Sequence, residues 1–385
     1  MGLGRLVLFL GILTTLVAGL AWYAGWRLIP AGWPPAARGA AWGFVGAVVV
    51  VQPLAFALRI ATGKEREILS WAAYVAMGFL LLTVTFTLLR DLGWLGARVA
   101  GFLPVDAERR RALLEMTNVG VLALAGGAFA VGVVRATARP TVVTINVPIV
   151  GLAPALDGFT IAQISDIHMG PTIKRAFLED VVATVNALDA DLVAVTGDVV
   201  DGSVAELRDQ TAPLADLKAR HGAWFITGNH EYYSGALEWI DEMKRLGMTA
   251  LIDEHRVIDH DGAAMVVAGV TDHSAPSMIP AHTSDPHKAV AGAPVDAFKL
   301  LLAHQPRSAY AAQKAGFQLQ LTGHTHGGQF FPGTLLVRLV QPFVEGLHQL
   351  EGMWVYTNRG TGYWGPPLRH TSITSEVTKL VLVKA

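Results

Sequence analysis

Four long apolar stretches without a charged residue lie in the first third of the chain, and charged residues occur only between them. Each stretch is about 20 residues long, which is the length of helix needed to cross about 30 Å of hydrocarbon. Trp and Tyr cluster near several of their ends, as is common where a membrane meets water. The stretches cover residues 6–26, 39–58, 68–89 and 116–134. We therefore expect residues 1–137 to form a membrane region with four transmembrane helices.

The rest of the chain alternates short apolar runs with longer amphipathic ones, a pattern typical of an α/β domain with buried central strands. Residues 138–158 contain Pro and Gly and are expected to form a linker and a first strand. The predicted strands are 159–165, 191–197, 222–228, 264–270, 298–304, 317–323, 353–358 and 374–383. The predicted helices are 176–188, 204–219 and 235–247. We expect residues 159–385 to form one catalytic domain.

Polar side chains with metal-binding chemistry follow five of these strands. They are Asp166 and His168, then Asp198, then Asn229 and His230, then His304, and finally His324 and His326. In open α/β sheets, ligands bind at the carboxyl ends of the strands. These side chains are therefore expected to converge along one edge of a sheet.

The donor types in this set favour a site for two divalent ions. Carboxylate oxygens and imidazole nitrogens suit ions of borderline hardness, and the chain has no cysteine for a thiolate site or a disulfide. One ion uses three or four protein ligands, whereas eight candidates are present. Two ions about 3.5–4 Å apart clamp the attacking and leaving oxygens of a displacement at phosphorus. Each short motif alone is more commonly a turn, a helix cap or a buried His, and only their joint occurrence favours the metal site.

Five ordered motifs, "DIH", "GDVVDG", "GNHE", "AHQP" and "GHTH", resemble the calcineurin-like metallophosphoesterase superfamily. The resemblance covers about residues 142–385 and implies a four-layer α/β/β/α sandwich that hydrolyses a phosphomonoester, phosphodiester or pyrophosphate bond. The segment that starts at Arg109, with paired Arg, then Leu and a Gly/Ala-rich apolar run, resembles a twin-arginine segment. The segments "VPIVGLAPALDGFTIAQISDIHMGPTI" and "NRGTGYWGPPLRH" resemble the bacterial membrane-associated branch of that superfamily, which often follows a twin-arginine segment.

The same resemblance implies a role for each site residue. One divalent ion would be held by Asp166, His168, Asp198 and His326, and the second by Asp198, Asn229, His304 and His324, with Asp198 bridging. Mn, Fe and Zn fit equally well. A hydroxide between the two ions would attack phosphorus. His230 would be the catalytic residue that binds no metal, stabilising the phosphoryl oxygens or protonating the leaving group.

Two further segments are candidates for contact with a substrate. The loop 360–370 places Tyr363, Trp364 and Arg369 beside glycines, and Arg369 is expected to meet a phosphate. The alternative for this loop is a packed turn stiffened by its two prolines. Residues 330–343 are unusually apolar for a loop after a metal motif. They are expected either to be core or to approach the bilayer or a lipid tail.

Charge is divided unevenly between the two parts of the chain. Residues 1–140 carry a net charge of +7, and the remainder carries −8. An acidic domain makes nucleic acid an improbable partner, because affinity for the phosphate backbone rests on Lys and Arg. The arginines at 109–111 precede the fourth stretch, and positive residues prefer the cytoplasm. We therefore predict a multi-pass protein of the cytoplasmic (inner) membrane whose catalytic domain lies on the extracytoplasmic side.

The function most consistent with these features is a membrane-anchored dinuclear phosphoesterase. Its partners would be the lipid bilayer and a phosphorylated small molecule, a phospholipid or an envelope precursor. One alternative is a metal-dependent membrane sensor whose phosphoesterase-like domain does not catalyse, although a pure binder needs no acid such as His230. Another is a four-span transporter with an accessory hydrolase, but the apolar stretches contain no charge to mark an ion pathway.

Overall fold

The computed structural model describes residues 3–62, 66–102, 106–370 and 372–385. The chain divides into two compact units. One is Met1–Val134 together with Gly365–Leu368, and the other is Arg135–Trp364 together with Arg369–Ala385. We call them the membrane unit and the phosphate-site unit.

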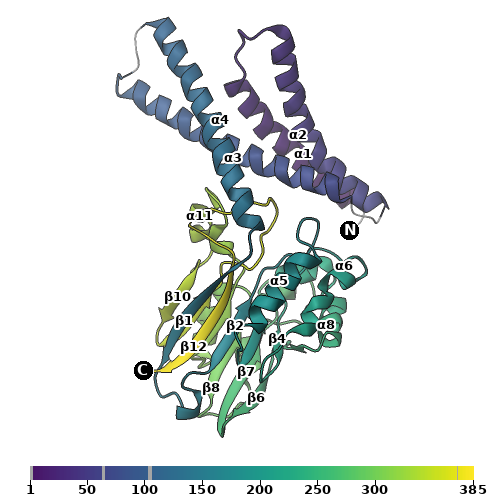
Figure 1. Ribbon diagram of the computed structural model, residues 1–385, viewed down its shortest axis with the longest axis vertical. Helices are drawn as coiled ribbons and strands as arrows, with labels where there is room; N and C mark the ends of the chain where they lie inside the picture. Colours follow the sequence, from purple (N-terminus) through teal and green to yellow (C-terminus); the bar gives the residue numbers. More distant parts are fainter. Residues whose placement is uncertain (1–2, 63–65, 103–105, 371) are drawn as a thin grey trace. The chain divides into compact units, whose positions relative to one another are not determined.

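Four long helices make up most of the membrane unit (Figure 1). They are α1 Leu3–Leu28, α2 Pro35–Thr62, α3 Glu67–Val99 and α4 Ala107–Thr137. By length and composition, three segments could cross a membrane: Pro35–Arg59 of α2, all of α3 and all of α4. The helix α1 covers the first predicted stretch but is not one of these three, so the count of four spans stays a prediction.

All four helices are longer than the apolar stretches that predicted them, and α3 and α4 extend furthest. The helix α3 continues ten residues beyond 89, through Arg90 and Asp91 to Val99, and α4 begins nine residues before 116. Arg, Leu and Glu propagate a helix well, so the helix does not end where the hydrophobicity ends. Charged residues expected in loops therefore lie within helices.

Two six-stranded sheets form the centre of the phosphate-site unit, with strand orders β1-β12-β2-β3-β4-β5 and β10-β11-β9-β8-β7-β6. The first sheet contains β1 Thr141–Ile149, β2 Thr160–Ile164, β3 Leu192–Val195, β4 Ala223–Phe225, β5 Thr249–Ala250 and β12 Glu376–Lys384. The second contains β6 Glu254–His260, β7 Ala263–Gly269, β8 Phe298–Leu302, β9 Leu319–Thr322, β10 Gly346–Leu350 and β11 Met353–Thr357. The strands from β2 to β5 run parallel, as do β7, β8, β9 and β11.

Helices and 3₁₀ turns connect these strands. The helices are α5 Arg175–Asn186, α6 Val204–Thr211, α7 Asn229–Ser234, α8 Ala236–Arg245, α9 Pro286–Val290, α10 Ala309–Lys314 and α11 Gly333–Leu336. The 3₁₀ turns are η1 Pro154–Leu156, η2 Ala212–Asp216, η3 Ala275–Ser277, η4 Pro306–Ser308, η5 His326–Gly328 and η6 Val337–Leu339.

Three buried apolar clusters hold these elements in four layers. Between the two sheets, residues such as Ile161 of β2 and Leu300 of β8 pack together. On the outer face of the first sheet, α5 and α8 pack against the strands, with Trp239 fully buried. On the outer face of the second sheet, α9 and α10 do the same. The α/β/β/α sandwich predicted from the motifs is confirmed.

The structure corrects some predicted elements. The helix predicted over 204–219 ends at Thr211 and continues as the 3₁₀ turn η2, because Pro213 has no N–H to donate and its ring clashes with the preceding turn. Three strands were not predicted: β5, β6 and β10. The strand β6 (EHRVIDH) is an edge strand with several exposed polar side chains, so it lacks the apolar run that reveals the central strands.

Candidate metal centre

Several polar residues that follow the strands of the two sheets have an unusual backbone conformation. Five residues after these strands have positive φ: Asp166 (53°), His168 (56°), Asp198 (51°), His324 (70°) and His326 (51°). Positive φ is uncommon for residues other than glycine and costs of order 1 kcal/mol or more at each position. Such strain is typical of functional sites, and here it is concentrated in the predicted metal ligands.

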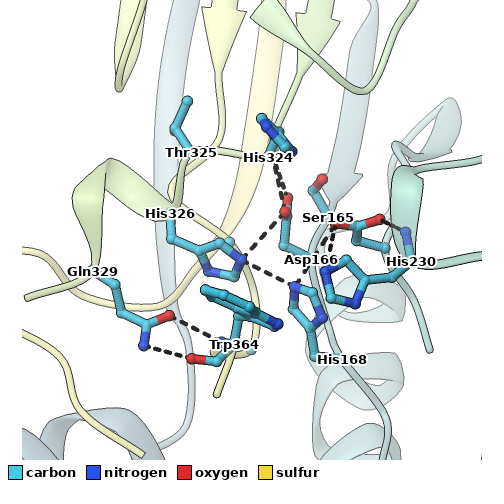
Figure 2. A network of polar contacts seen from close by, with 12 residues as sticks. Ser165, Asp166, His168, His230, His324, Thr325, His326, Gln329 and Trp364 are labelled. Atoms are coloured by element: carbon cyan, nitrogen blue, oxygen red, sulfur yellow. Dashed lines mark hydrogen bonds and ion pairs between the residues drawn. The ribbon is translucent and has the colours of Figure 1, made fainter. Parts of the chain in front are cut away.

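Asp166, His168 and His326 form the first group of ligand atoms (Figure 2). The Nε2 atoms of His168 and His326 are 3.0 Å apart, and His326 Nε2 lies 3.4 Å from Asp166 Oδ1. All three side chains are buried. The main-chain N–H of His324 donates to both carboxylate oxygens of Asp166, at 2.9 and 3.0 Å, and so fixes the orientation of the carboxylate.

Asp198, His304 and His324 form the second group. His304 Nε2 lies 3.0 Å from Asp198 Oδ2, and His324 Nδ1 lies 3.3 Å from His304 Nε2. His304 Nδ1 is 2.8 Å from the carbonyl oxygen of Thr196. A proton on Nδ1 can donate there, which leaves the Nε2 lone pair facing the site, as a metal ligand requires.

The carboxylate of Asp198 lies between the two groups. Its Oδ2 is 3.0 Å from His304 Nε2 and 4.0 Å from the Nε2 atoms of both His168 and His230. The buried Oδ1 of Asn229 has no hydrogen-bond partner within the described part of the chain. The clustered imidazoles and carboxylates match the ligand preferences of borderline divalent ions, and an unpartnered buried amide oxygen is a further possible donor. The residues present therefore fit a divalent metal site.

His230 also lies at this site, in a third group with His168 and Asp198. Its ring centroid is 4.6 Å from that of His168, and its Nδ1 is 2.5 Å from Asp201 Oδ1. The same oxygen of Asp201 lies 3.1 Å from His168 Nδ1. Asp201 thus orients two rings of the site. Asp201 belongs to the motif "GDVVDG", but no role was predicted for it. Its position three residues after Asp198 is the sequence feature that could have indicated a role at the site.

Asp201→Asn is expected to lower kcat about tenfold and to weaken metal binding about 10- to 100-fold, because an outer carboxylate sets the orientation and basicity of a ligating His. Isothermal titration of the metal-stripped protein, together with steady-state kinetics, measures both quantities. Asp241→Asn, on an exposed position of α8, is the matched control and should leave both unchanged. Unchanged metal affinity in Asp201→Asn would contradict this role.

Glu231 connects the loops that carry the ligands. Its carboxylate accepts from the main-chain N–H groups of Asp198 (2.9 Å), Val199 (2.8 Å) and Gly228 (2.7 Å). Burial raises the pKa of Glu231 to about 8, and the negative charge of Asp198 adds to this. Gly228 is needed for the close approach, since a Cβ there would lie 2.1 Å from Asp198 Oδ1.

Burial and neighbouring charges shift the pKa values of the histidines of the site in opposite directions. Burial, reinforced by the charge of His304, lowers the pKa of His324 to about 4. Burial also favours the neutral form of His304, but the neighbouring Asp198 outweighs it and raises the pKa of His304. Burial by itself would raise the pKa of Asp198, and the adjacent histidines lower it instead. Neutral imidazole beside ionised carboxylate is the combination that binds a divalent ion.

The loop 360–370 provides one exposed aromatic side chain at the site. Trp364 is 55% exposed, and its ring lies 6.0 Å from that of His230, which Figure 2 shows beside it. Tyr233, which the sequence analysis did not identify, is also exposed and lies 5.3 Å from the His230 ring. The side chain of Gln329 bonds the main-chain N–H and C=O of Trp364, both at 2.9 Å. Trp364 and Tyr233 therefore flank His230.

The other two residues predicted to contact substrate are buried. Tyr363 is 3% exposed and Arg369 is 1% exposed. The guanidinium of Arg369 donates to main-chain carbonyls, including those of Arg359 (2.7 Å) and Gly360 (3.2 Å). These contacts and the burial of Arg369 favour a packed position over contact with a substrate phosphate, which stays a prediction. The alternative of a packed turn describes this part of the loop.

Comparison with known proteins shows which family this chain resembles. The profile of the calcineurin-like phosphoesterase family matches residues 159–328, the segment that contains all the candidate ligands. A transmembrane protein with metallophosphoesterase domain from Danio rerio is 37% identical over 81% of this chain and 72% of its own length. The protein of the same description from Bos taurus is 34% identical over 86% and 77% of the two chains. A metallophosphoesterase of Helicobacter pylori is 33% identical over 73% and 74%.

These relatives include proteins named as transmembrane, and this chain has three helices long and apolar enough to span a bilayer. The chain is therefore membrane-associated. The family acts on phosphorylated substrates with divalent metals, and the ligand groups described above fit such ions. The chain belongs to the calcineurin-like metallophosphoesterase family and is a metal-dependent phosphoesterase.

Proposed function

We propose that this protein hydrolyses a phosphoester or pyrophosphate bond at a centre of two divalent ions, and that the two ions share Asp198. The observation that carries the proposal is the position of Asp198 Oδ2, between His304 on one side and His168 on the other. Asp166, His168 and His326 would complete the first ion's ligands, and Asn229, His304 and His324 those of the second. The ions are Mn, Fe or Zn, alone or mixed. When bound, they would neutralise phosphate charge and make a water molecule more acidic.

The protein's own residues would position the substrate and move a proton. Asp201 holds the Nδ1 side of His230, which leaves Nε2 directed to the carboxylate of Asp198. From there, His230 can donate a proton to the leaving oxygen or a hydrogen bond to the phosphoryl group. Trp364 and Tyr233 would bound the entrance on either side of His230 and limit access of water.

Metal removal tests the dinuclear centre directly. Metal-stripped protein is expected to lose turnover of p-nitrophenyl phosphate and bis-p-nitrophenyl phosphate, and added Mn is expected to restore it. Titration with metal should show full activity only near two equivalents per chain. The proposed reaction needs both ions, which would share Asp198 as a ligand. Full activity at one equivalent would contradict the dinuclear proposal. Two bound equivalents without any turnover would favour the sensor alternative.

We further propose four membrane spans, with the phosphate-site unit on the extracytoplasmic side of the cytoplasmic membrane. An even number of spans places both ends of the chain on one side. The arginines 109–111 before the fourth stretch favour a cytoplasmic position for the loop between α3 and α4. The remainder of the chain then follows α4 to the opposite face.

We propose a lipid phosphate, either a phospholipid or a lipid-linked pyrophosphate, as the substrate class. The segment directly after the metal ligand His326 is apolar and exposed: Leu335 is 59%, Leu336 57% and Leu339 81% exposed. It forms α11 and η6, and α11 approaches the ligand loop so closely that a Cβ on Gly328 would lie 2.4 Å from Thr334 Cα. A surface of leucines beside the site is suited to a hydrocarbon chain.

Replacing Leu336 and Leu339 together with Ser is expected to lower hydrolysis of a lipid phosphate in vesicles about tenfold, since each leucine gains about 1.5–3 kcal/mol when fully buried. Turnover of p-nitrophenyl phosphate should not change, because this substrate has no hydrocarbon chain for the exposed leucines to bind. Leu237→Ser, at an exposed position of α8, is the control. Equal losses on both substrates would argue against contact with a lipid chain.

A further inference from the structure

The membrane unit contains a partly buried group of charged and polar side chains far along the chain from the metal ligands. We call it the arginine cluster; its members are Tyr23, Arg27, Arg90, Asp91 and Asn118. Asp91 accepts from Tyr23 Oη (2.8 Å), from Arg27 Nε (2.6 Å) and Nη2 (2.8 Å), and from Arg90 Nε (2.7 Å). Arg90 Nη1 also donates to Asn118 Oδ1. The helices α1, α3 and α4 therefore meet at one carboxylate.

The charges of the arginine cluster do not balance. Two guanidinium groups face a single carboxylate, and the Arg90 side chain is only 5% exposed. Its Nη2 is buried and has no hydrogen-bond partner among the residues that the structure describes. Glu115, about one turn before Asn118 on α4, is exposed and already paired with Arg111 at 3.1 Å. Arg90 shares the carboxylate of Asp91 with Arg27, so two positive charges face one negative charge, and one buried donor of Arg90 is left unsatisfied.

The depth of the arginine cluster matches that of lipid phosphates. Its residues lie at or just beyond the ends of the predicted apolar stretches, after 26, after 89 and near 116. Trp22 and Trp26 on α1 are both exposed and stack with ring centroids 5.8 Å apart. Aromatic side chains of this kind mark the level of the headgroups. An anion reaching the cluster from the bilayer would therefore come from a headgroup.

An apolar cavity of about 230 Å³ lies among α1, α2, α3 and α4, and several residues that line it are close in the helices to members of the arginine cluster. Its lining includes Ala24 and Leu28, which flank Arg27, and Leu122, about one turn beyond Asn118. Phe79 and Thr83 of α3 also line it, and Thr83 lies about 10 Å before Arg90 along that helix. The cavity exposes almost no polar surface, which suits hydrocarbon and not water.

We propose that this part of the membrane unit binds one anionic phospholipid, with the headgroup phosphate at Arg90 and Arg27 and an acyl chain in the adjoining cavity. Guanidinium groups bind phosphate oxygens with charge-assisted hydrogen bonds, and the free Nη2 of Arg90 supplies a donor. The bound lipid supplies the missing negative charge. This lipid site is separate from the catalytic centre and does not depend on the proposed reaction.

Native mass spectrometry of the full chain in detergent, with phosphatidylglycerol or phosphatidylcholine added at equal concentration, tests the proposal. Wild type should retain one phosphatidylglycerol with about tenfold preference, since an uncompensated buried charge is worth several kcal/mol. Arg90→Gln should abolish the preference. Arg111→Gln, on the exposed arginine paired with Glu115, should not. Equal retention of the two lipids by wild type, or unchanged preference in Arg90→Gln, would overturn the proposal.

Turnover of p-nitrophenyl phosphate and the Tm show whether Arg90→Gln folds. Two further variants test the proposal if it does not. Arg90→Lys keeps the charge and should keep the preference. Leu122→Trp fills the cavity without altering the arginine cluster and should release the lipid. Competition with inorganic phosphate separates the two sources of the anion. If phosphate displaces the lipid fully and Leu122→Trp has no effect, the site recognises a free anion and the lipid proposal fails.

Discussion

Replacing Asp198 with alanine is expected to lower kcat/KM for p-nitrophenyl phosphate about 10³-fold or more. The carboxylate lies 3.0 Å from His304 and 4.0 Å from His168, so its loss removes the one ligand that both ions would share. It also leaves the buried His304 without its ionic partner. A 10³-fold loss corresponds to about 4 kcal/mol of transition-state stabilisation, which is within the range expected of a metal site.

The measurement combines steady-state kinetics with metal content after dialysis. Asp198→Ala should hold less metal than wild type, and Asp241→Ala on the exposed face of α8 should match wild type in both respects. Asp198→Asn keeps the shape of the side chain and removes the charge, so it separates packing from ligation. If Asp198→Ala retained both activity and metal, the shared-carboxylate arrangement would be wrong.

Replacing His230 with alanine is expected to lower kcat about 10²- to 10⁴-fold without loss of metal. Positioned proton donors contribute rate factors of this size. His230 is held through Nδ1 by Asp201, and its Nε2 is 4.0 Å from Asp198 Oδ2, the same distance as that of His168. The resemblance to the family assigns it the role of the catalytic residue that binds no metal. Its loss should therefore affect proton transfer and leave the other ligand groups in place.

The choice of leaving group makes this prediction specific. The rate lost in His230→Ala should be larger for phenyl phosphate than for p-nitrophenyl phosphate, because the poorer leaving group needs the proton more. His287→Ala, on an exposed histidine in α9, is the control. A fall in metal content as large as that of Asp198→Ala would instead make His230 a ligand.

Much of the metal centre could be predicted because its residues are local to strand ends. Apolar runs identified β2, β3, β4, β8 and β9, and the polar residues that follow them were the right ones to examine. Parallel strands bring their carboxyl ends to one edge, so order along the chain translates into proximity. The role of Asp201 could not be predicted in this way. Its contacts with His168 and His230 depend on how two separate loops face each other.

Which residues of the loop 360–370 are exposed at the site depends on how the loop packs, and the local sequence does not reveal this. Tyr363, Trp364 and Arg369 are equally plausible substrate residues in the sequence, yet only Trp364 is exposed. A guanidinium serves a substrate phosphate or main-chain carbonyls equally well as a donor. In the structure, Arg369 donates to the main-chain carbonyls of His326, Arg359 and Gly360, which favours the second role.

The sequence by itself determined the class of this protein, its apolar helices and which side chains to consider as candidate metal ligands. These features rest on composition, periodicity and short spacings, which hydrophobic burial and backbone geometry translate directly into elements. Only the tertiary structure decided which distant residues meet. It pairs β1 with β12, more than 230 residues later, and brings Arg27, Arg90 and Asn118 together around Asp91. Such contacts form because the whole chain packs at once, and no local pattern encodes them.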